Sequence, residues 1–369
     1  MIACHAELVG SLLRPRELLR AREGLAAGQI ESAELRAAED RAVDGAVALQ
    51  ETAGLEVVTD GEMRRLSFQS PIAEAVEGFG DHDLDAFLWG HWRGGGAGGE
   101  WDRARPPALG VVDTLKPRGF IFAKEFSYLR GRTGRIAKIC LPSPSLFGNF
   151  WNPARPPPAY PSLESFLADV VQILRAEVAE LARLGATYIQ LDAPHYTALL
   201  EPGARRFYES LGWSAAQWLE RGIEMDNAVI AAAPQVTFGF HLCRGNQGSR
   251  WLVAGDYLPI ARPIFRNLRA QRLLLEYDDE RSGSFAALAE IPEDKQVVLG
   301  LVTSKRGTLE PRGQLIARIR QAAAYLPLER LALSPQCGFS TSVIGNEITH
   351  GQQREKIELV VQTAGEVWG

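Results

Sequence analysis

The sequence predicts an α/β fold, a (β/α)8 TIM barrel with one insertion. Eight short runs of β-branched and other apolar residues recur along the 369 residues, and segments with helical periodicity separate them. Strands that alternate with helices favour right-handed crossovers and a parallel sheet, and eight such units are enough to close a barrel. A doubly wound open sheet is the alternative that the same alternation allows.

The predicted strands are bounded by turn residues and are too short for helices. They cover residues 6–10, 55–59, 135–141, 187–191, 236–242, 272–277, 297–303 and 330–333. Amphipathic segments between them predict helices over residues 32–53, 162–184, 214–233 and 315–325.

One stretch interrupts this alternation between the second and third predicted strands. Residues from about 79 to 131 contain WGHWRGGGAGGEWDRARPPALG and then the aromatic-rich GFIFAKEFSYLR. We expect an inserted subdomain or loop with a short hairpin of its own. The whole chain, residues 1–369, is expected to form a single catalytic barrel domain that contains this insertion.

Charge and hydropathy exclude several classes of partner. The net charge of −5 gives no basic field, so nucleic acid is not an expected partner. The amino-terminal residues lack the pattern of a signal peptide, and the longest apolar runs are strand-sized, so we expect a cytoplasmic protein without a membrane partner. A homo-oligomer remains open.

Four cysteines are spread along the chain: Cys4, Cys140, Cys243 and Cys337. In a long cytosolic chain, such sparse cysteines are metal ligands, nucleophiles or core residues rather than a disulfide framework.

The residues most suggestive of chemistry lie at three predicted strand ends. In GFHLCRGN, His241 and Cys243 stand two positions apart, and strand side chains two positions apart point to the same side. Glu276 ends the next strand in LLLEYDD, and Cys337 follows the last strand in ALSPQCGF. Because catalytic residues of such barrels lie at the C-terminal ends of the strands, all four are expected on one face.

Two thiolates, one imidazole and one carboxylate suit zinc in type and in number. An H-x-C pair alone is a weak pattern, and Glu276 could instead be a strand-end carboxylate bound to a backbone turn. If all four residues bind, the site has a net negative charge, which makes the metal a poor Lewis acid for a carbonyl. It suits the metal to hold a thiolate that stays nucleophilic, whereas a free thiol has a pKa of about 8.5.

Motifs along most of the chain resemble the cobalamin-independent methionine synthase superfamily, in its short form with the catalytic barrel only. The resemblance rests on VGSLLRPRELL, VTDGE, YIQLDAP, HLCRGN, LEYDD, VVLGLVTSK, LSPQCGF and EVWG. It implies one Zn²⁺ per chain, held by His241, Cys243, Glu276 and Cys337, and methyl transfer to a homocysteine-like thiol. The reaction would be of the 5-methyltetrahydropteroyltriglutamate–homocysteine S-methyltransferase type.

The resemblance also implies three residues that bind the thiol substrate. Ser11 would hold its amino-acid part, and Glu62 and Asp192 would hold its ammonium group. A homocysteine-like zwitterion needs hydrogen-bond acceptors for its ammonium and donors for its carboxylate.

Two positions depart from the family pattern. Ala193 stands where full methionine synthases have a second carboxylate, and Lys305 stands in roughly the place of their proton-donating histidine. Lys305 would either donate a proton or, as we favour, bind an anionic group of the substrate, and His195 is a fallback proton donor. Thiol activation is therefore better supported than a methyl-folate donor.

An aromatic group formed by Phe147, Phe150, Trp151 and Tyr160 could stack on a planar donor, although core packing is the commoner role. Three other functions remain open: opening of an epoxide by another zinc-bound thiol, a metal-free barrel resembling uroporphyrinogen decarboxylase, and a structural zinc protein.

Overall fold

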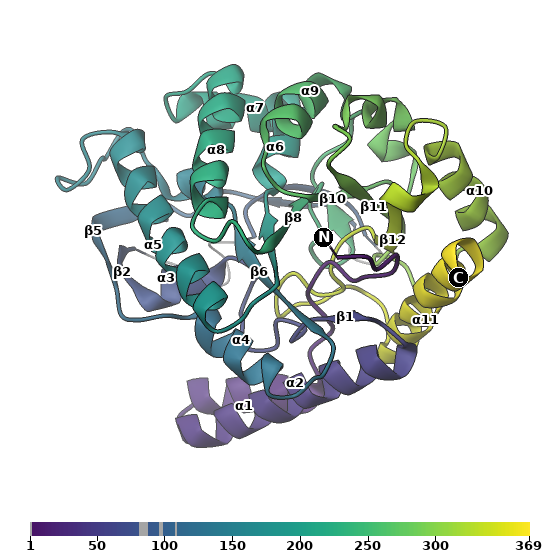
Figure 1. Cartoon of the computed structure of the whole chain (residues 1–369). Helices are drawn as coiled ribbons and strands as arrows, with labels where there is room; N and C mark the ends of the chain where they lie inside the picture. Colours follow the sequence, from purple (N-terminus) through teal and green to yellow (C-terminus); the bar gives the residue numbers. More distant parts are fainter. Residues whose placement is uncertain (1, 81–87, 96–98, 108) are drawn as a thin grey trace.

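A computed structural model describes residues 2–80, 88–95, 99–107 and 109–369. Seven parallel strands form one curled sheet, and helices surround it on the outside (Figure 1). The sheet order is β1 (Val57–Val58), β6 (Ile136–Pro142), β7 (Tyr188–Asp192), β8 (Thr237–Leu242), β10 (Arg272–Glu276), β11 (Gln296–Val302) and β12 (Leu331–Pro335).

The strand order follows the chain without a reversal. A doubly wound sheet reverses its order at a switch point, so the observed order argues against that alternative. The alternation of helices and strands is thus confirmed, and seven of the eight predicted strands are present within a few residues of their expected limits.

The first predicted strand, residues 6–10, was wrong as a full strand. Among the described residues it makes one parallel bridge, between Ala6 and Leu333 at the edge of β12. Glu7 N–H donates to the carbonyl of Leu333 over 3.2 Å, and Leu333 N–H donates to the carbonyl of His5 over 2.8 Å. The described sheet therefore has seven strands, and this segment lies beside its last one.

Eleven α-helices occur in the described residues, and several begin at capping residues. Ser162, Ser214 and Thr349 each accept a hydrogen bond from the backbone N–H three positions later, which satisfies a free donor of the first turn. The helices are α1 (Arg16–Ala26), α2 (Ser32–Ala53), α3 (Ser70–Ala75), α4 (Phe122–Arg130), α5 (Leu163–Arg183), α6 (Pro194–Ala198), α7 (Pro202–Ser210), α8 (Ala215–Ile230), α9 (Leu258–Asn267), α10 (Arg312–Ala322) and α11 (His350–Trp368).

Between β1 and β6 the described chain forms small antiparallel sheets. β2 (Val76–Phe79) pairs with β5 (Val111–Pro117), while β3 (Gly90–Gly94) pairs with β4 (Trp101–Arg103) as the short hairpin that was expected here. β3 also pairs with β9 (Arg250–Trp251), which follows the loop after β8. The hairpin is thereby attached to the loop after β8, in which the predicted metal ligand Cys243 lies.

A buried ion cluster lies inside the curled sheet. Glu7 is fully buried and accepts hydrogen bonds from Lys138 Nζ over 2.8 Å and from Arg272 Nη2 over 2.7 Å. Tyr188 donates its hydroxyl to the same carboxylate over 2.9 Å. These interactions join the segment before α1 to β6, β7 and β10. None of the described helices is long and apolar enough to cross a membrane.

Candidate metal centre and substrate cavity

Three of the four predicted metal ligands lie together. The donor atoms of His241, Cys243 and Cys337 all lie within 4.8 Å of one another, and the two sulfur atoms are 3.4 Å apart. His241 lies within β8 and Cys243 directly after it, so strand alternation points both side chains the same way. Cys337 follows β12, and all three side chains are buried.

The ring of His241 presents a free nitrogen to the two thiols. Its Nδ1 lies 3.2 Å from the carbonyl of Leu274, which can only accept, so Nδ1 carries the proton. Its Nε2 is buried without a hydrogen-bond partner. A bare imidazole nitrogen fixed by a backbone carbonyl is the usual arrangement of a metal-binding histidine. The donor set therefore fits Zn²⁺ in residue type, in number and in the orientation of the imidazole.

The two cysteines are electrostatically unlike. A hydrogen bond from Cys337, together with nearby His241, holds the pKa of the Cys243 thiol well below its usual range in spite of burial. The same hydrogen bond and burial raise the pKa of Cys337. One thiolate is thus favoured even before any cation is considered, as expected of a metal-binding pair.

Glu276, the fourth predicted ligand, lies outside this group of three. Its carboxylate accepts hydrogen bonds from Arg244 N–H over 3.0 Å, Arg281 Nη2 over 2.8 Å and Lys305 Nζ over 3.3 Å. The contact with the Arg244 backbone matches the alternative given above, in which Glu276 is a strand-end carboxylate bound to a backbone turn. Lys305 is turned toward Glu276 and does not line the cavity described below.

A second buried group combines two of the predicted substrate-binding residues. One oxygen or sulfur atom each of Glu62, Asp192 and Cys140 lies within 4.8 Å of the others. Glu62 Oε2 has no hydrogen-bond partner, while Asp192 Oδ1 accepts from Gln190 Nε2 over 2.7 Å. Burial raises the pKa of Glu62 to about 7 and also raises that of Asp192. Arg65 Nη1 lies 3.8 Å from Glu62 Oε1, and the unpartnered Oε2 beside Asp192 is left to bind a further cation or hydrogen-bond donor.

The backbone at Glu62 is held in an uncommon conformation. Its φ is +55°, in the left-handed region, and its N–H donates to Asp60 Oδ1 over 2.9 Å. A residue other than glycine whose backbone is held in this region at a cost in free energy is typical of functional sites.

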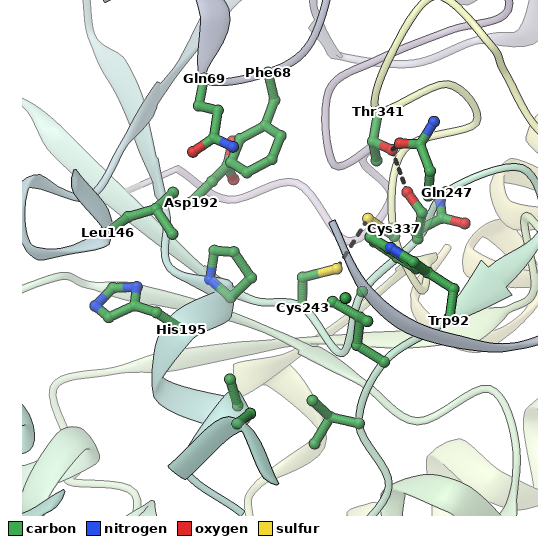
Figure 2. A pocket seen from close by; sticks show the side chains of 18 of the residues that line it. Phe68, Gln69, Trp92, Leu146, Asp192, His195, Cys243, Gln247, Cys337 and Thr341 are labelled. Carbon is green, nitrogen blue, oxygen red and sulfur yellow. Dashed lines mark hydrogen bonds between the residues drawn. The ribbon is translucent and has the colours of Figure 1, made fainter. Parts of the chain in front are cut away.

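The first group and the two carboxylates of the second line one cavity of about 400 Å³ (Figure 2). Ser11, Glu62 and Asp192 lie on its wall with the three metal-site residues, so the predicted thiol-binding and metal-binding residues share one space. The mouths of ligand sites in parallel α/β sheets lie at the carboxyl ends of the strands, as here.

His195 also lines this cavity, but it is neutral. Burial lowers its pKa to about 3. Its Nε2 lies 2.8 Å from Ser145 Oγ, while its Nδ1 has no partner. The ring thus offers a hydrogen-bonding edge to a ligand, but it does not carry a positive charge at neutral pH.

The cavity has an aromatic lining that the sequence pattern did not reveal. Phe68, Trp89, Trp92, Phe207 and Tyr208 contribute to it, and they come from three separate segments. The suspected stacking group, Phe147, Phe150, Trp151 and Tyr160, is buried in the core and does not line the cavity. For that group, packing is the observed role. The repeated tryptophan of WGHW was the available signal for the true lining.

These features define an α/β protein with a curled parallel sheet and a buried Cys–Cys–His donor set at the carboxyl ends of its strands. Residues 159–365 match the model of the family "Cobalamin-independent synthase, Catalytic domain". The chain belongs to this family.

Relatives and solved structures agree over nearly the whole chain. "Uncharacterized protein YxjH" of Bacillus subtilis (strain 168) is 32% identical over 99% of this chain and 94% of its own. "Methionine synthase" of Pyrococcus abyssi is 25% identical over 90% of this chain and 85% of its own. The crystal structure of the putative vitamin-B12 independent methionine synthase from Listeria monocytogenes has a TM-score of 0.75 at 26% identity, covering 100% of this chain and 99% of its own.

Proposed function

We propose that the protein is a zinc-dependent S-methyltransferase that acts on a small amino thiol of the homocysteine type. One observation carries this proposal: the His241–Cys243–Cys337 group and the Glu62–Asp192 pair line the same cavity. The first group suits the binding of a metal and a thiol sulfur, and the second suits the binding of an ammonium group.

The family supports the nature of the reaction. Relatives named methionine synthase and 5-methyltetrahydropteroyltriglutamate–homocysteine methyltransferase are about a quarter identical to this chain, at 25% and 26%. Those names describe methyl transfer to homocysteine in those proteins. Zinc and homocysteine come to this chain as part of the proposal, because its own residues provide matching groups.

Zn²⁺, when bound, lowers the pKa of a coordinated thiol and keeps its sulfur nucleophilic. His241, Cys243 and Cys337 would hold the metal and leave a fourth position for the substrate sulfur, as catalytic zinc sites with three protein ligands do. Glu62 and Asp192 would accept the hydrogen bonds of the substrate ammonium, and Ser11 would donate to its carboxylate. The substrate sulfur would thereby be fixed beside the methyl donor, which lowers the entropic part of the barrier.

Two of the rival functions agree less well with the geometry. A metal-free decarboxylase leaves the unpartnered Nε2 of His241 and the adjacent thiols without a role. A carrier thiol with an anionic body would meet Glu62 and Asp192 in the cavity wall, where the guanidinium of Arg93 is paired with Glu201.

The test is the metal content of purified protein and its response to thiol. We expect about one zinc per chain. Cys243→Ser and Cys337→Ser should each lose most of it, whereas Cys4→Ser, at an equally buried cysteine far along the chain from the site, should retain it. X-ray absorption at the zinc edge should show a further sulfur ligand when homocysteine is added. Full zinc in both site variants, or an unchanged edge, would overturn the proposal.

A further inference from the structure

We propose that the methyl donor is a small onium compound, a sulfonium or quaternary ammonium ion, rather than an N-methyl folate. This inference rests on the proposed function, because it names the second substrate of the same cavity. Two features of the cavity lead to it, its charge and its aromatic lining, and the positions of the candidate proton donors agree with it.

The cavity wall is acidic. Glu62, Asp192 and Glu201 line it, and no lysine does so among the described residues. Arg93 is the one arginine among the described lining residues, and its Nη2 already lies 3.8 Å from Glu201 Oε1. With Glu62 and Asp192 bound to the ammonium of the thiol, Glu201 is the carboxylate left to the donor, so a donor with several carboxylates would meet a like charge there, whereas a cation would be attracted.

The aromatic lining supplies faces suited to a cation. The rings of Trp89 and Phe207 meet edge to face with centroids 4.7 Å apart, and Phe207 meets Tyr208 at 5.3 Å, so three rings form a continuous wall. Figure 2 shows Phe68, Trp92 and His195 around the space that Cys243 and Cys337 also line. The Nε1 of Trp92 donates to the carbonyl of Leu88 over 2.9 Å, which occupies the polar edge of the indole. Aromatic faces beside carboxylates are the general means of binding quaternary ammonium groups.

Among the described lining residues, the buried carboxyls with raised pKa values are Glu62 and Asp192, and the proposed function already uses both to bind the ammonium group of the thiol. Transfer from an N-methyl folate leaves a basic amine nitrogen that must gain a proton in the transition state. His195 is neutral, and Lys305 lies outside the lining against Glu276. His91 lies on the cavity rim with a side chain that is 48% exposed, and its Nε2 is 3.7 Å from Glu100. Tyr208 already donates its hydroxyl to Asn149 Oδ1 over 2.9 Å.

An onium donor removes the need for that acid. The thiol loses its proton to solvent when its sulfur becomes a thiolate. A thiolate lone pair then forms the new S–CH₃ bond, while the electron pair of the old bond stays on the departing sulfur or nitrogen. The positive heteroatom leaves as a neutral sulfide or amine, so charge and atoms balance without any further proton or co-reactant.

The size of the cavity agrees with a small donor. Its volume of about 400 Å³ must hold the amino thiol as well as the methyl donor. Pockets for one drug-sized ligand span roughly 300–1,000 Å³, so two substrates share a space near the lower limit for one.

A binding experiment with matched ligands tests the cation site. Choline and its neutral isostere 3,3-dimethylbutan-1-ol differ in charge but hardly in shape. In the zinc-loaded protein we expect calorimetry to give a Kd about 2- to 30-fold lower for choline. Trp92→Leu should reduce this ratio toward one, while Phe120→Leu, at an exposed ring outside the cavity, should leave it unchanged. Equal affinities for the two ligands in the unmodified protein would overturn the inference.

A transfer experiment separates this inference from the proposed function. Zinc-loaded protein with homocysteine is supplied with trimethylsulfonium or with methyltetrahydrofolate, as the mono- and the triglutamate. Methionine from the sulfonium alone supports the onium donor. Methionine from the folate alone overturns the inference and leaves the S-methyltransferase in place. A zinc edge that does not respond to homocysteine would instead overturn the proposed function. If neither donor reacts, the choline comparison decides.

Discussion

Lys305 Nζ lies 3.3 Å from Glu276 Oε1, so the cation suggested as proton donor or anion clamp neutralises the carboxylate suggested as a metal ligand. Arg281 Nη2 binds the same oxygen over 2.8 Å. Both side chains of the lysine–glutamate pair are buried, and the pair is therefore little screened by solvent. Because of this ion pair, Lys305 is expected to stabilise the fold rather than to bind substrate, and Glu276 is expected to contribute little to metal binding.

Lys305→Met should destabilise the fold rather than alter substrate binding. The substitution leaves a buried carboxylate with one cation fewer, and hydrogen bonds to charged groups contribute about 1.5–3 kcal/mol. Urea unfolding should show a loss of this size. Lys305→Arg should recover part of it, since Arg keeps the charge. The double variant Lys305→Met/Glu276→Gln should lose less stability than the two single variants lose in sum.

A different result would restore a direct role for the lysine. If Lys305→Met unfolds at the same urea concentration as the unmodified protein but reacts more slowly with saturating substrates, then the side chain acts in the reaction and not in the ion pair.

Glu276→Gln should weaken zinc binding far less than Cys337→Ser. The carboxylate already has three hydrogen-bond donors, whereas the sulfur of Cys337 lies in the group of three donors around the bare Nε2 of His241. Competition with a zinc chelator should give a much larger rise in Kd for the cysteine variant. Equal losses would mean that Glu276 leaves its ion pairs to bind the metal, as the family resemblance implied.

Much of the fold was predictable because most strands are buried on both faces. Such strands are nearly continuous apolar runs, and the runs over β6, β7, β8, β10 and β11 indicated their ends within two residues. Residues 6–10 show the limit of this signal. Apart from Glu7 they are apolar, and apart from Ala6 they are buried, but the carbonyls of Val9 and Gly10 accept from the side chains of Cys140 and Thr59 instead of from a neighbouring strand. An apolar pattern predicts burial, and it does not predict which group pairs with the backbone.

The site was predictable where its residues are local. His241 lies on β8 and Cys243 follows directly after its end, two positions later, so their common direction follows from strand geometry. Cys140 was not assigned to the site, because its position beside Glu62 and Asp192 depends on how three separate segments meet. The aromatic lining has the same origin, since Phe68, Trp92 and Phe207 are brought together only by the folded chain. Charge neutralisation of Glu276 by Arg281 likewise has no pattern that could have been recognised beforehand.

Asp192→Asn should weaken the binding of amino thiols without changing the zinc content. Loss of a charge-assisted hydrogen bond to the substrate ammonium should cost about 1.5–3 kcal/mol, or roughly 10- to 150-fold in Kd. The control is 3-mercaptopropanoate, which has the thiol and a carboxylate but lacks the ammonium, and whose affinity should not fall. Titration of both thiols by calorimetry measures the two effects, and an equal loss for both would place Asp192 elsewhere than at the ammonium.

Glu7 should make the free energy of unfolding depend on pH in the acidic range. Burial alone would raise the pKa of its carboxyl, but Lys138 and Arg272 lower it from 4.5 to about 2. A carboxyl with a lowered pKa in the folded state stabilises the fold above its unfolded pKa and loses that contribution as the pH falls through its folded pKa. Glu7 should therefore contribute about 3 kcal/mol above pH 5, and the contribution should decrease from about pH 4.5 toward pH 2.

The comparison of Glu7→Gln with the unmodified protein isolates this contribution from other carboxyls. Burial raises the pKa of Glu125 and Asp226 to about 7, and these groups change stability in the opposite direction as the pH falls. Their effect is common to both proteins and cancels in the difference.

Above pH 5 the Glu7→Gln variant should be less stable by about 3–5 kcal/mol, because Lys138 and Arg272 lose a buried partner. The difference should shrink below pH 4.5, where the native glutamate itself becomes protonated. Glu17→Gln, at an exposed carboxylate paired with Arg41, should show no such pH-dependent difference. A difference for Glu7→Gln that stays constant from pH 7 to pH 3, measured by urea unfolding, would contradict the lowered pKa.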